Sequence, residues 1–449
     1  MKKIVILVCL LVLALGVAGF SAPAQAAETG THIHETPPAP DRSWGETFKD
    51  IWTRDKLTGD WGGLRTDLAD HGFYPNVRLS QFYQGVSSGG REQVGRYGGL
   101  VDWRADADAE KLFGLWKGLS LSLHAQTRFG KDIGAEAGAF GLPNTPLLYP
   151  LPGDFAGTNV TGLLLMQSLF DGRAVAFGGK INTVDLWTLI YPDVGYGQEG
   201  FLNLNSLAAG LPWFRFVSLS MWGGGVWTVK SEGLDAGFFA FGQENVTDTW
   251  HGWNDSFNDG VGLMGFYRFF YDLGHKPGSV ALFAGGSTKK YPSLDETSFV
   301  VVPGEGLVDT ESKHPWDVAL YLHQVFWQAD GNPKRQAHVF MGGTVADDNA
   351  SFSNVSVFMN IETFGLLAAR PHDRMGIAGF WNRLSSDVVD LLNDIPTLSK
   401  RQNLYGFEAY YNIALNPWLH LSPDIQFYRN ANKKDDIAII PGVRLVMDF

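Results

Sequence analysis

Several segments of this sequence switch between apolar and polar side chains at every residue. From 101 onward, apolar and charged residues alternate without a break as Val101, Asp102, Trp103, Arg104, Ala105, Asp106, Ala107 and Asp108. Successive side chains of a β-strand point to opposite faces of the sheet. This segment therefore predicts a strand with one apolar face and one charged face.

The same alternation returns in later parts of the chain. It occurs over 119–128, 355–362, 405–415, 419–428 and 443–449, and Phe449, the last residue of the sequence, belongs to the last of these segments. Segments of about ten residues with this pattern are typical of strands that cross a membrane with lipid on one side and water on the other. Because the pattern recurs, we expect many such strands in one sheet.

The composition agrees with a membrane barrel and excludes helical spans. The chain has 54 Gly, 31 Phe, 15 Trp and 14 Tyr but only 18% charged residues. After residue 26, no stretch approaches the roughly 18 consecutive apolar residues that a membrane helix requires. At roughly 25 residues per strand with its loop, 16 to 18 strands fit the chain. We therefore predict an all-β fold, a closed transmembrane antiparallel β-barrel of about 16 strands over residues 73–449.

The N-terminus has the organisation of a secretory signal peptide. Lys2 and Lys3 precede an apolar run over 4–20, and Ala24-Gln25-Ala26 fits a small-residue cleavage site. We predict that residues 1–26 are removed on export. The single cysteine, Cys9, lies inside this segment, so the mature protein is expected to contain no disulfide.

Residues 27–72 are predicted to form an N-terminal lead followed by one short helix. The lead carries several prolines together with His32 and His34, which we interpret as part of a solvated tail rather than as a metal site. Within 57–72, Asp60 is the expected N-cap and Gly72 the expected stop. The barrel is predicted to begin at residue 73.

Turn-forming residues separate the predicted strands. Asp171-Gly172 joins two apolar runs and predicts a hairpin with a two-residue turn. Long stretches rich in Gly, Pro, Asn and Asp predict loops, one of which should fold inward to narrow the barrel and the last of which should hold a short helix at 387–392. These predicted loops are 130–161, 191–205, 289–315 and 370–401.

Charge and motifs exclude other classes of protein. The net charge is −12, and nucleic acid is not an expected partner because phosphate binding needs a basic surface. The sequence contains no spacing typical of a metal site, a phosphate-binding loop or a catalytic set. We therefore expect no cofactor and no metal.

Four motifs resemble one family of membrane proteins. The segment 57–65 (LTGDWGGLR) is similar to the opening motif of the OprB-type carbohydrate-selective porins, and 110–114, 179–185 and 416–419 also match that family in order. The resemblance implies a 16-stranded barrel in the bacterial outer membrane. It further implies a constricted eyelet, lined by charged and aromatic side chains, that favours monosaccharides.

The alternation identifies side chains that should face the lumen. Charged groups can replace the water that hydrogen-bonds to sugar hydroxyls, and an aromatic ring can cover the apolar face of a sugar. Lys180, Asp185 and Trp187 are added because they flank one of the family-like motifs. The full set of pore-lining candidates is Asp102, Arg104, Asp106, His124, Arg128, Lys180, Asp185, Trp187, Glu362, Glu408 and Tyr410.

The sequence leaves alternatives open. A passive porin would take small sugars as solutes and lie in outer-membrane lipid, although a general porin for another solute and a homo-oligomer are also compatible. A barrel enzyme would need a catalytic set, for which only Ser287, His251 and His314 could be invoked. A soluble carbohydrate-binding β protein is disfavoured because its outer surface would have to be polar.

Overall fold

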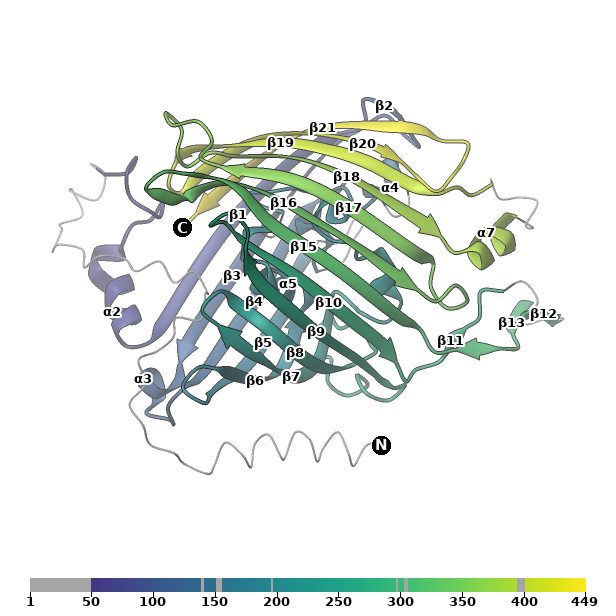
Figure 1. Ribbon diagram of the computed structural model, residues 1–449, viewed down its shortest axis with the longest axis horizontal. Coiled ribbons are helices and arrows are strands. Elements are labelled where there is room, and N and C mark those ends of the chain that lie inside the picture. The colour runs from purple at the N-terminus through teal and green to yellow at the C-terminus, as the bar shows by residue number, and fades with distance from the viewer. Residues whose placement is uncertain are drawn as a thin grey trace.

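The computed structural model describes residues 50–138, 141–150, 156–194, 197–295, 298–302, 306–393 and 400–449 (Figure 1). The predicted signal peptide, 1–26, and the lead up to residue 49 lie outside the described residues. Among the described residues, every helix is too short or too polar to traverse a bilayer.

Sixteen long strands, each antiparallel to its neighbours, form one continuous sheet in the described chain. They are β1 (Phe73–Gly85), β3 (Gly95–Asp108), β4 (Leu119–Gly130), β5 (Gly157–Leu169), β6 (Ala174–Asn182), β7 (Ser220–Lys230), β8 (Gly233–Gly242), β9 (Val261–Asp272), β10 (Pro277–Ser287), β15 (Trp316–Ala329), β16 (Asn332–Ala346), β17 (Ser353–Phe364), β18 (Arg374–Leu384), β19 (Leu404–Asn416), β20 (Leu419–Arg429) and β21 (Asp436–Asp448).

The sheet closes on itself at the chain ends. Strand β1 pairs with β3 on one side and with β21 on the other, where Arg78 lies opposite Asp448. The three-residue strand β2 (Ser88–Gly90) also pairs with β21. Figure 1 shows the first and last strands side by side in the barrel wall. Closure leaves no unpaired sheet edge, and the predicted antiparallel barrel of about 16 strands is confirmed.

The barrel wall is apolar outside and polar inside, as the alternation predicts. Trp103 and Leu320 are 46% and 55% exposed on the outer surface. Their strand neighbours Asp102 and Tyr321 point inward and are buried. A wall of this kind gains stability when lipid covers its outer face, because its large apolar side chains then leave water.

Short helices lie at both ends of the barrel. At one end are η1 (Trp61–Gly63), α2 (Leu64–Asp70) and α3 (Ala109–Phe113), and at the other is α7 (Ser386–Asn393). The predicted N-terminal helix is confirmed; Asp60 is the N-cap of η1, which continues directly into α2, whose own N-cap is Gly63. Asp60 still accepts the Thr66 backbone N–H at 2.9 Å, from one turn earlier.

Two long loops fold into the barrel. The prediction that a loop folds inward is therefore confirmed. The first follows β4 and contains α4 (Gly134–Ala137) and η2 (Pro146–Leu148). The second, here called the inner loop, runs from 183 to 219 and contains α5 (Thr183–Ile190), η3 (Pro192–Val194), α6 (Leu204–Leu207) and η4 (Leu211–Arg215). Its apolar side chains join the main hydrophobic cluster with inward-facing rings of the wall.

Two predicted connections differ from the structure. The hairpin at Asp171-Gly172 is present, but four residues rather than two separate Leu169 from its partner Ala174. Part of the predicted loop 370–401 is strand β18. A strand was not predicted there because the segment contains Gly376 and Gly379 and lacks a clean polar face. The helix predicted at 387–392 is confirmed as α7. The loop after β10 also forms the small strands β11 (Tyr291–Pro292), β12 (Phe299–Val302), β13 (Gly306–Asp309) and β14 (Ser312–Lys313).

Candidate functional site

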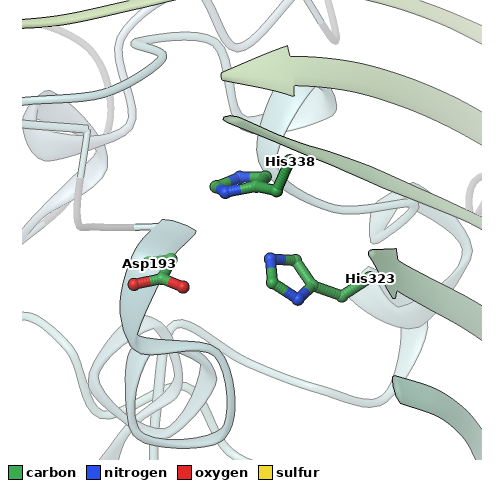
Figure 2. Close-up of side chains that lie close together, drawn as sticks. All are labelled: Asp193, His323 and His338. Carbon is green, nitrogen blue, oxygen red and sulfur yellow. The ribbon is translucent and has the colours of Figure 1, made fainter. Parts of the chain in front are cut away.

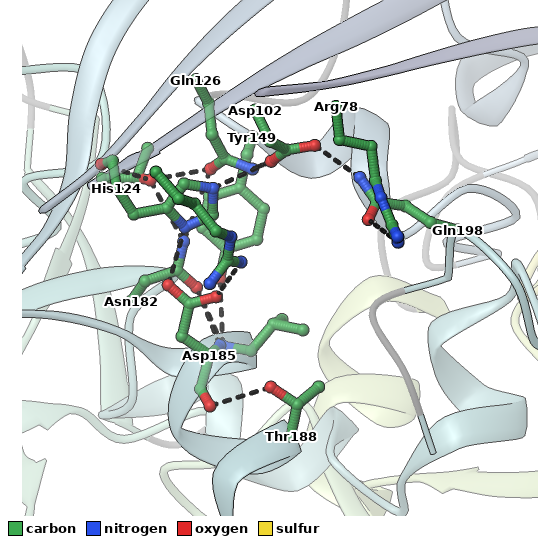
Figure 3. A network of polar contacts seen from close by, with 12 residues as sticks. Arg78, Asp102, His124, Gln126, Tyr149, Asn182, Asp185, Thr188 and Gln198 are labelled. Atoms are coloured by element: carbon green, nitrogen blue, oxygen red, sulfur yellow. Dashed lines mark hydrogen bonds and ion pairs between the residues drawn. The ribbon is translucent and has the colours of Figure 1, made fainter. Parts of the chain in front are cut away.

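Polar side chains from three wall strands and the inner loop meet inside the barrel. We call this group the polar cluster, and Figure 3 shows most of it. It comprises Arg78 on β1, Asp102 and Arg104 on β3, His124 on β4, and Asp185, Gln198 and Glu199 of the inner loop.

His124 links the wall to the inner loop. Its Nε2 lies 2.8 Å from a carboxylate oxygen of Asp102, and its Nδ1 lies 2.7 Å from Asp185. Arg104, which pairs with His124 across β3 and β4, donates to the other oxygen of Asp185 at 2.6 Å. Two carboxylates and two basic side chains therefore form one connected chain of contacts.

The start of α5 fixes the position of Asp185. The side chain of the N-cap residue, Asn182, accepts the backbone N–H groups of Val184 and Asp185 at 3.1 and 3.2 Å. This capping orients the first turn of the helix toward β3 and β4. Burial raises the pKa of Asp185, but Arg104 and His124 lower it more and hold it well below its usual range. Asp185 is therefore an anion at neutral pH.

Arg78 forms the second half of the cluster. It holds Asp448 with two hydrogen bonds of 2.7 and 2.8 Å, and its third nitrogen lies 2.9 Å from Glu199. The Arg78 guanidinium lowers the pKa of Glu199 to about 2. Gln198 donates to Asp102 and accepts from Arg78, so it joins the two halves.

The charged groups of the cluster remain partly open to solvent. The side chains of Arg104 and Glu199 are 37% and 34% exposed, and those of Arg78 and Asp185 are 25% and 20% exposed. Asp102 and His124 are buried behind them. Arg104 lies beside Asp185 and Arg78 beside Glu199, so the partly exposed pairs offer both hydrogen-bond donors and acceptors.

Further polar contacts anchor the inner loop to β19 and β21. Glu408 accepts the backbone N–H groups of Leu202 and Asn203, and Arg444 donates to the carbonyl oxygens of Gly197 and Gly200 at 2.6 and 2.9 Å. These contacts hold the segment that carries Gln198 and Glu199.

The predicted pore-lining residues fall into two groups. Asp102, Arg104, His124 and Asp185 come together in the polar cluster, and Asp106 is half-buried next to them on β3. The other six are buried and make contacts within the protein instead. Arg128 pairs with Asp132, Lys180 donates to the Thr249 carbonyl, Glu362 and Tyr410 contact Arg374, Glu408 binds the inner loop, and Trp187 packs among aromatic rings.

Sequence reasoning missed Arg78, Gln198, Glu199 and Arg374. Arg78 alternates with Val77 and Leu79, so its inward direction could have been read from β1. Gln198 and Glu199 lie in a loop without periodicity, and no local signal gives their direction.

A catalytic arrangement of Ser287 and His314 is not formed. The Ser287 hydroxyl donates to Gln243 at 2.6 Å, and His314 Nδ1 lies 3.1 Å from the backbone carbonyl of Ser287. His251 instead accepts the backbone N–H of Gly252.

Comparisons with known proteins agree with this architecture. The model of the family described as "Carbohydrate-selective porin, OprB family" matches residues 92–449. Porin B of Pseudomonas aeruginosa is 23% identical over 475 residues, covering 97% of this chain and 96% of that protein. The high-pH structure of Pseudomonas putida OprB superposes with a TM-score of 0.76 at 19% identity, over 89% of this chain and 100% of that one. The low-pH structure gives 0.54 at 17% identity, over 88% and 99%.

The solved structures establish the shared barrel fold, and the family match extends over most of the chain. The membrane-facing outer wall and the polar interior fit the same conclusion. This chain belongs to the OprB family of carbohydrate-selective porins, passive channels of the bacterial outer membrane rather than enzymes.

Proposed function

We propose that small neutral sugars, of monosaccharide size, cross the channel by passive diffusion past the polar cluster. The observation that carries this proposal is the pairing of four partly exposed charges of the cluster in opposite pairs, Arg104 with Asp185 and Arg78 with Glu199. A permeating ion gains little from such a balanced pair of charges. A sugar gains hydrogen bonds from both partners.

The chemistry of the cluster suits hydroxyl groups. The two arginines offer N–H donors, and the two carboxylates offer acceptor oxygens, whereas each sugar hydroxyl both donates and accepts. The exposed atoms can therefore replace the water that a sugar loses in a narrow passage. Binding there must stay weak, because a tight site would retain the solute instead of conducting it.

A general porin for amino acids or organic acids is the competing proposal. Liposomes containing the protein should swell faster in sugars than in anionic solutes of similar size, and the preferred sugar should reduce single-channel conductance in planar bilayers. Equal or faster swelling in the anions would contradict the sugar proposal and leave the channel intact. Failure to conduct at all would contradict both.

We also propose that residues 1–26 are removed and that the mature chain begins near Ala27. The basic start, the apolar run and the small-residue site support this cleavage. N-terminal sequencing of protein extracted from outer membranes tests it, and an N-terminus at Met1 would contradict it.

One chain is proposed to form one complete pore surrounded by outer-membrane lipid. The sheet closes within a single chain through β1 and β21, so conduction requires no second copy. Crosslinking in detergent, combined with single-channel recording, tests whether oligomers conduct in steps that correspond to individual chains.

A further inference from the structure

Three side chains from distant parts of the sequence, none of them part of the polar cluster, converge on one point inside the barrel. Asp193 belongs to η3 of the inner loop, His323 to β15 and His338 to β16. Figure 2 shows the carboxylate and the two imidazole rings gathered in one space. One potential ligand atom from each residue lies within 4.8 Å of the others.

The barrel register brings the two rings together. His323 pairs with Phe340, and His338 pairs with Val325, so the histidines are diagonal neighbours on the inner face of β15 and β16. Their ring centroids are 4.6 Å apart. Diagonal neighbours in an antiparallel sheet are close enough for such side chains to meet.

Packing of the inner loop brings Asp193 to the same point. Tyr191, two residues before it, lies against Phe340 with ring centroids 4.8 Å apart. Arg374 donates to the backbone carbonyl of Asp193. This contact does not involve the Asp193 carboxylate. The loop and two wall strands thus each contribute one donor group.

His338 is buried and His323 is half-buried, and ring nitrogens of both lack hydrogen-bond partners among the described residues. His338 is 0% exposed, and within the described chain neither of its ring nitrogens makes a hydrogen bond; the Nε2 of His323 is also unsatisfied. The nearest acceptor to His338 is Glu362, at the long distance of 3.5 Å from Nε2. A buried polar group without a partner destabilises the fold, and a bound cation would give one nitrogen of each ring a partner.

The charges around the three side chains are balanced, because the carboxylates of Asp193 and Glu362 lie near the guanidinium groups of Arg268 and Arg374. The carboxylate of Glu362 lies behind His338, and Arg374 is bound to that carboxylate with two contacts of 2.9 Å. Arg268 donates to the Ile190 carbonyl and stacks on Tyr191. A carboxylate behind a histidine is the arrangement that commonly orients metal-binding imidazoles.

We propose that Asp193, His323 and His338 bind one divalent transition-metal ion of the zinc type. Two imidazole nitrogens and one carboxylate oxygen form a donor set that zinc accepts, with a fourth position for water. Nitrogen and oxygen ligands of a tetrahedral zinc ion lie roughly 3.3–3.6 Å apart, so side chains whose ligand atoms are up to 4.8 Å apart must move closer on binding. The bound ion crosslinks the inner loop to β15 and β16.

Zinc binding to the full chain tests this proposal. His32 and His34 in the lead are first changed to glutamine in every sample, and no histidine tag is used, so that other imidazoles do not compete. After treatment with a chelator, the protein is titrated with zinc against a chromogenic indicator, and metal content is measured after dialysis. We expect one equivalent to bind and to raise the temperature of unfolding.

Two variants and a control separate this site from adventitious binding. Asp193→Asn keeps the size of the side chain but removes its charge, and His338→Gln removes a buried imidazole ligand. Each variant should weaken zinc binding at least tenfold and abolish the rise in unfolding temperature. His275→Gln, on an exposed turn, should bind like the parent. If His338→Gln does not fold, the zinc affinity of Asp193→Asn alone tests the proposal. Zinc binding that is absent from the parent, or equal in parent and Asp193→Asn, would overturn the proposal.

Discussion

Neutralising Asp185 should convert the channel from one that favours neutral solutes into one that favours anions. Asp185 accepts from Arg104 at 2.6 Å and contacts His124 at 2.7 Å. In Asp185→Asn the Arg104 side chain, 37% exposed, keeps its positive charge without the facing carboxylate. The polar cluster therefore gains one net positive charge close to the solute path.

The size of the effect follows from the distance over which this charge acts. Two unit charges about 4 Å apart interact by about 1 kcal/mol in water and by about 4 kcal/mol at an effective dielectric constant of 20. Because Arg104 is partly solvated, the lower figure is appropriate. It corresponds to a roughly fivefold rise in the permeability of anions relative to neutral sugars.

The assay is the reversal potential of single channels in a salt gradient, combined with swelling rates for a sugar and an organic acid. Low salt is needed, because at 0.1 M the field of the charge is screened over about 10 Å. Asp171→Asn, in an exposed short turn, is the matched control and should behave like the parent. A folded Asp185→Asn barrel with an unchanged reversal potential would refute the assignment of Asp185 to the solute path.

Three other predictions concern different parts of the barrel. The pKa of Glu199 is about 2 against an ordinary 4.5, so its ion pair with Arg78 is fully present above pH 4.5 and is lost as the pH falls through about 2. As the pH falls from 4.5 to about 2, the reversal potential of the parent channel should shift toward greater anion selectivity. The Glu199→Gln channel should show that shift already at neutral pH and should not change further. Parallel curves of reversal potential against pH for the parent and the variant would contradict this prediction. Trp187→Ala removes a ring that packs on Tyr321 and Trp213 and should cost about 3–5 kcal/mol. Single-channel recordings should then show a noisier and larger conductance, and an unchanged trace would argue against packing as the anchor of the inner loop. Leu320→Arg places a charge on the lipid-facing wall and should cost about 2–4 kcal/mol near the bilayer midplane. Its folding yield in lipid vesicles should fall while that of Leu320→Val does not; equal yields would place this position away from lipid.

The alternation of side chains predicts the barrel because a strand has only two faces. Once Trp103 is assigned to lipid, Asp102 and Arg104 must point inward, and the same logic places Glu408 and Tyr410 inside the wall. What the pattern cannot give is how much of the interior is filled. Glu408 and Tyr410 face inward, yet loop residues cover them, because Leu202 and Phe201 pack there.

Strand β18 shows a second limit of the pattern. Gly376, Ala378 and Phe380 interrupt its inward polar face, so the segment resembles a loop in sequence. The sheet nevertheless requires a partner for both β17 and β19, and backbone hydrogen bonds to these neighbours hold β18 in place whatever its side chains are. Arg374, at the start of this strand, was missed as a consequence.

Long-range convergence is the feature that sequence spacing conceals most completely. Asp193 is separated from His323 by strands β7 to β14, and His323 and His338 lie on neighbouring strands joined by a turn. Metal sites that can be read from sequence place their ligands on one helix or one tight turn, where a fixed spacing sets the geometry. In a barrel the fixed quantity is instead the register between strands, which depends on every turn before it. A pair of inward histidines on adjacent strands becomes recognisable as a potential ligand pair only once that register is known.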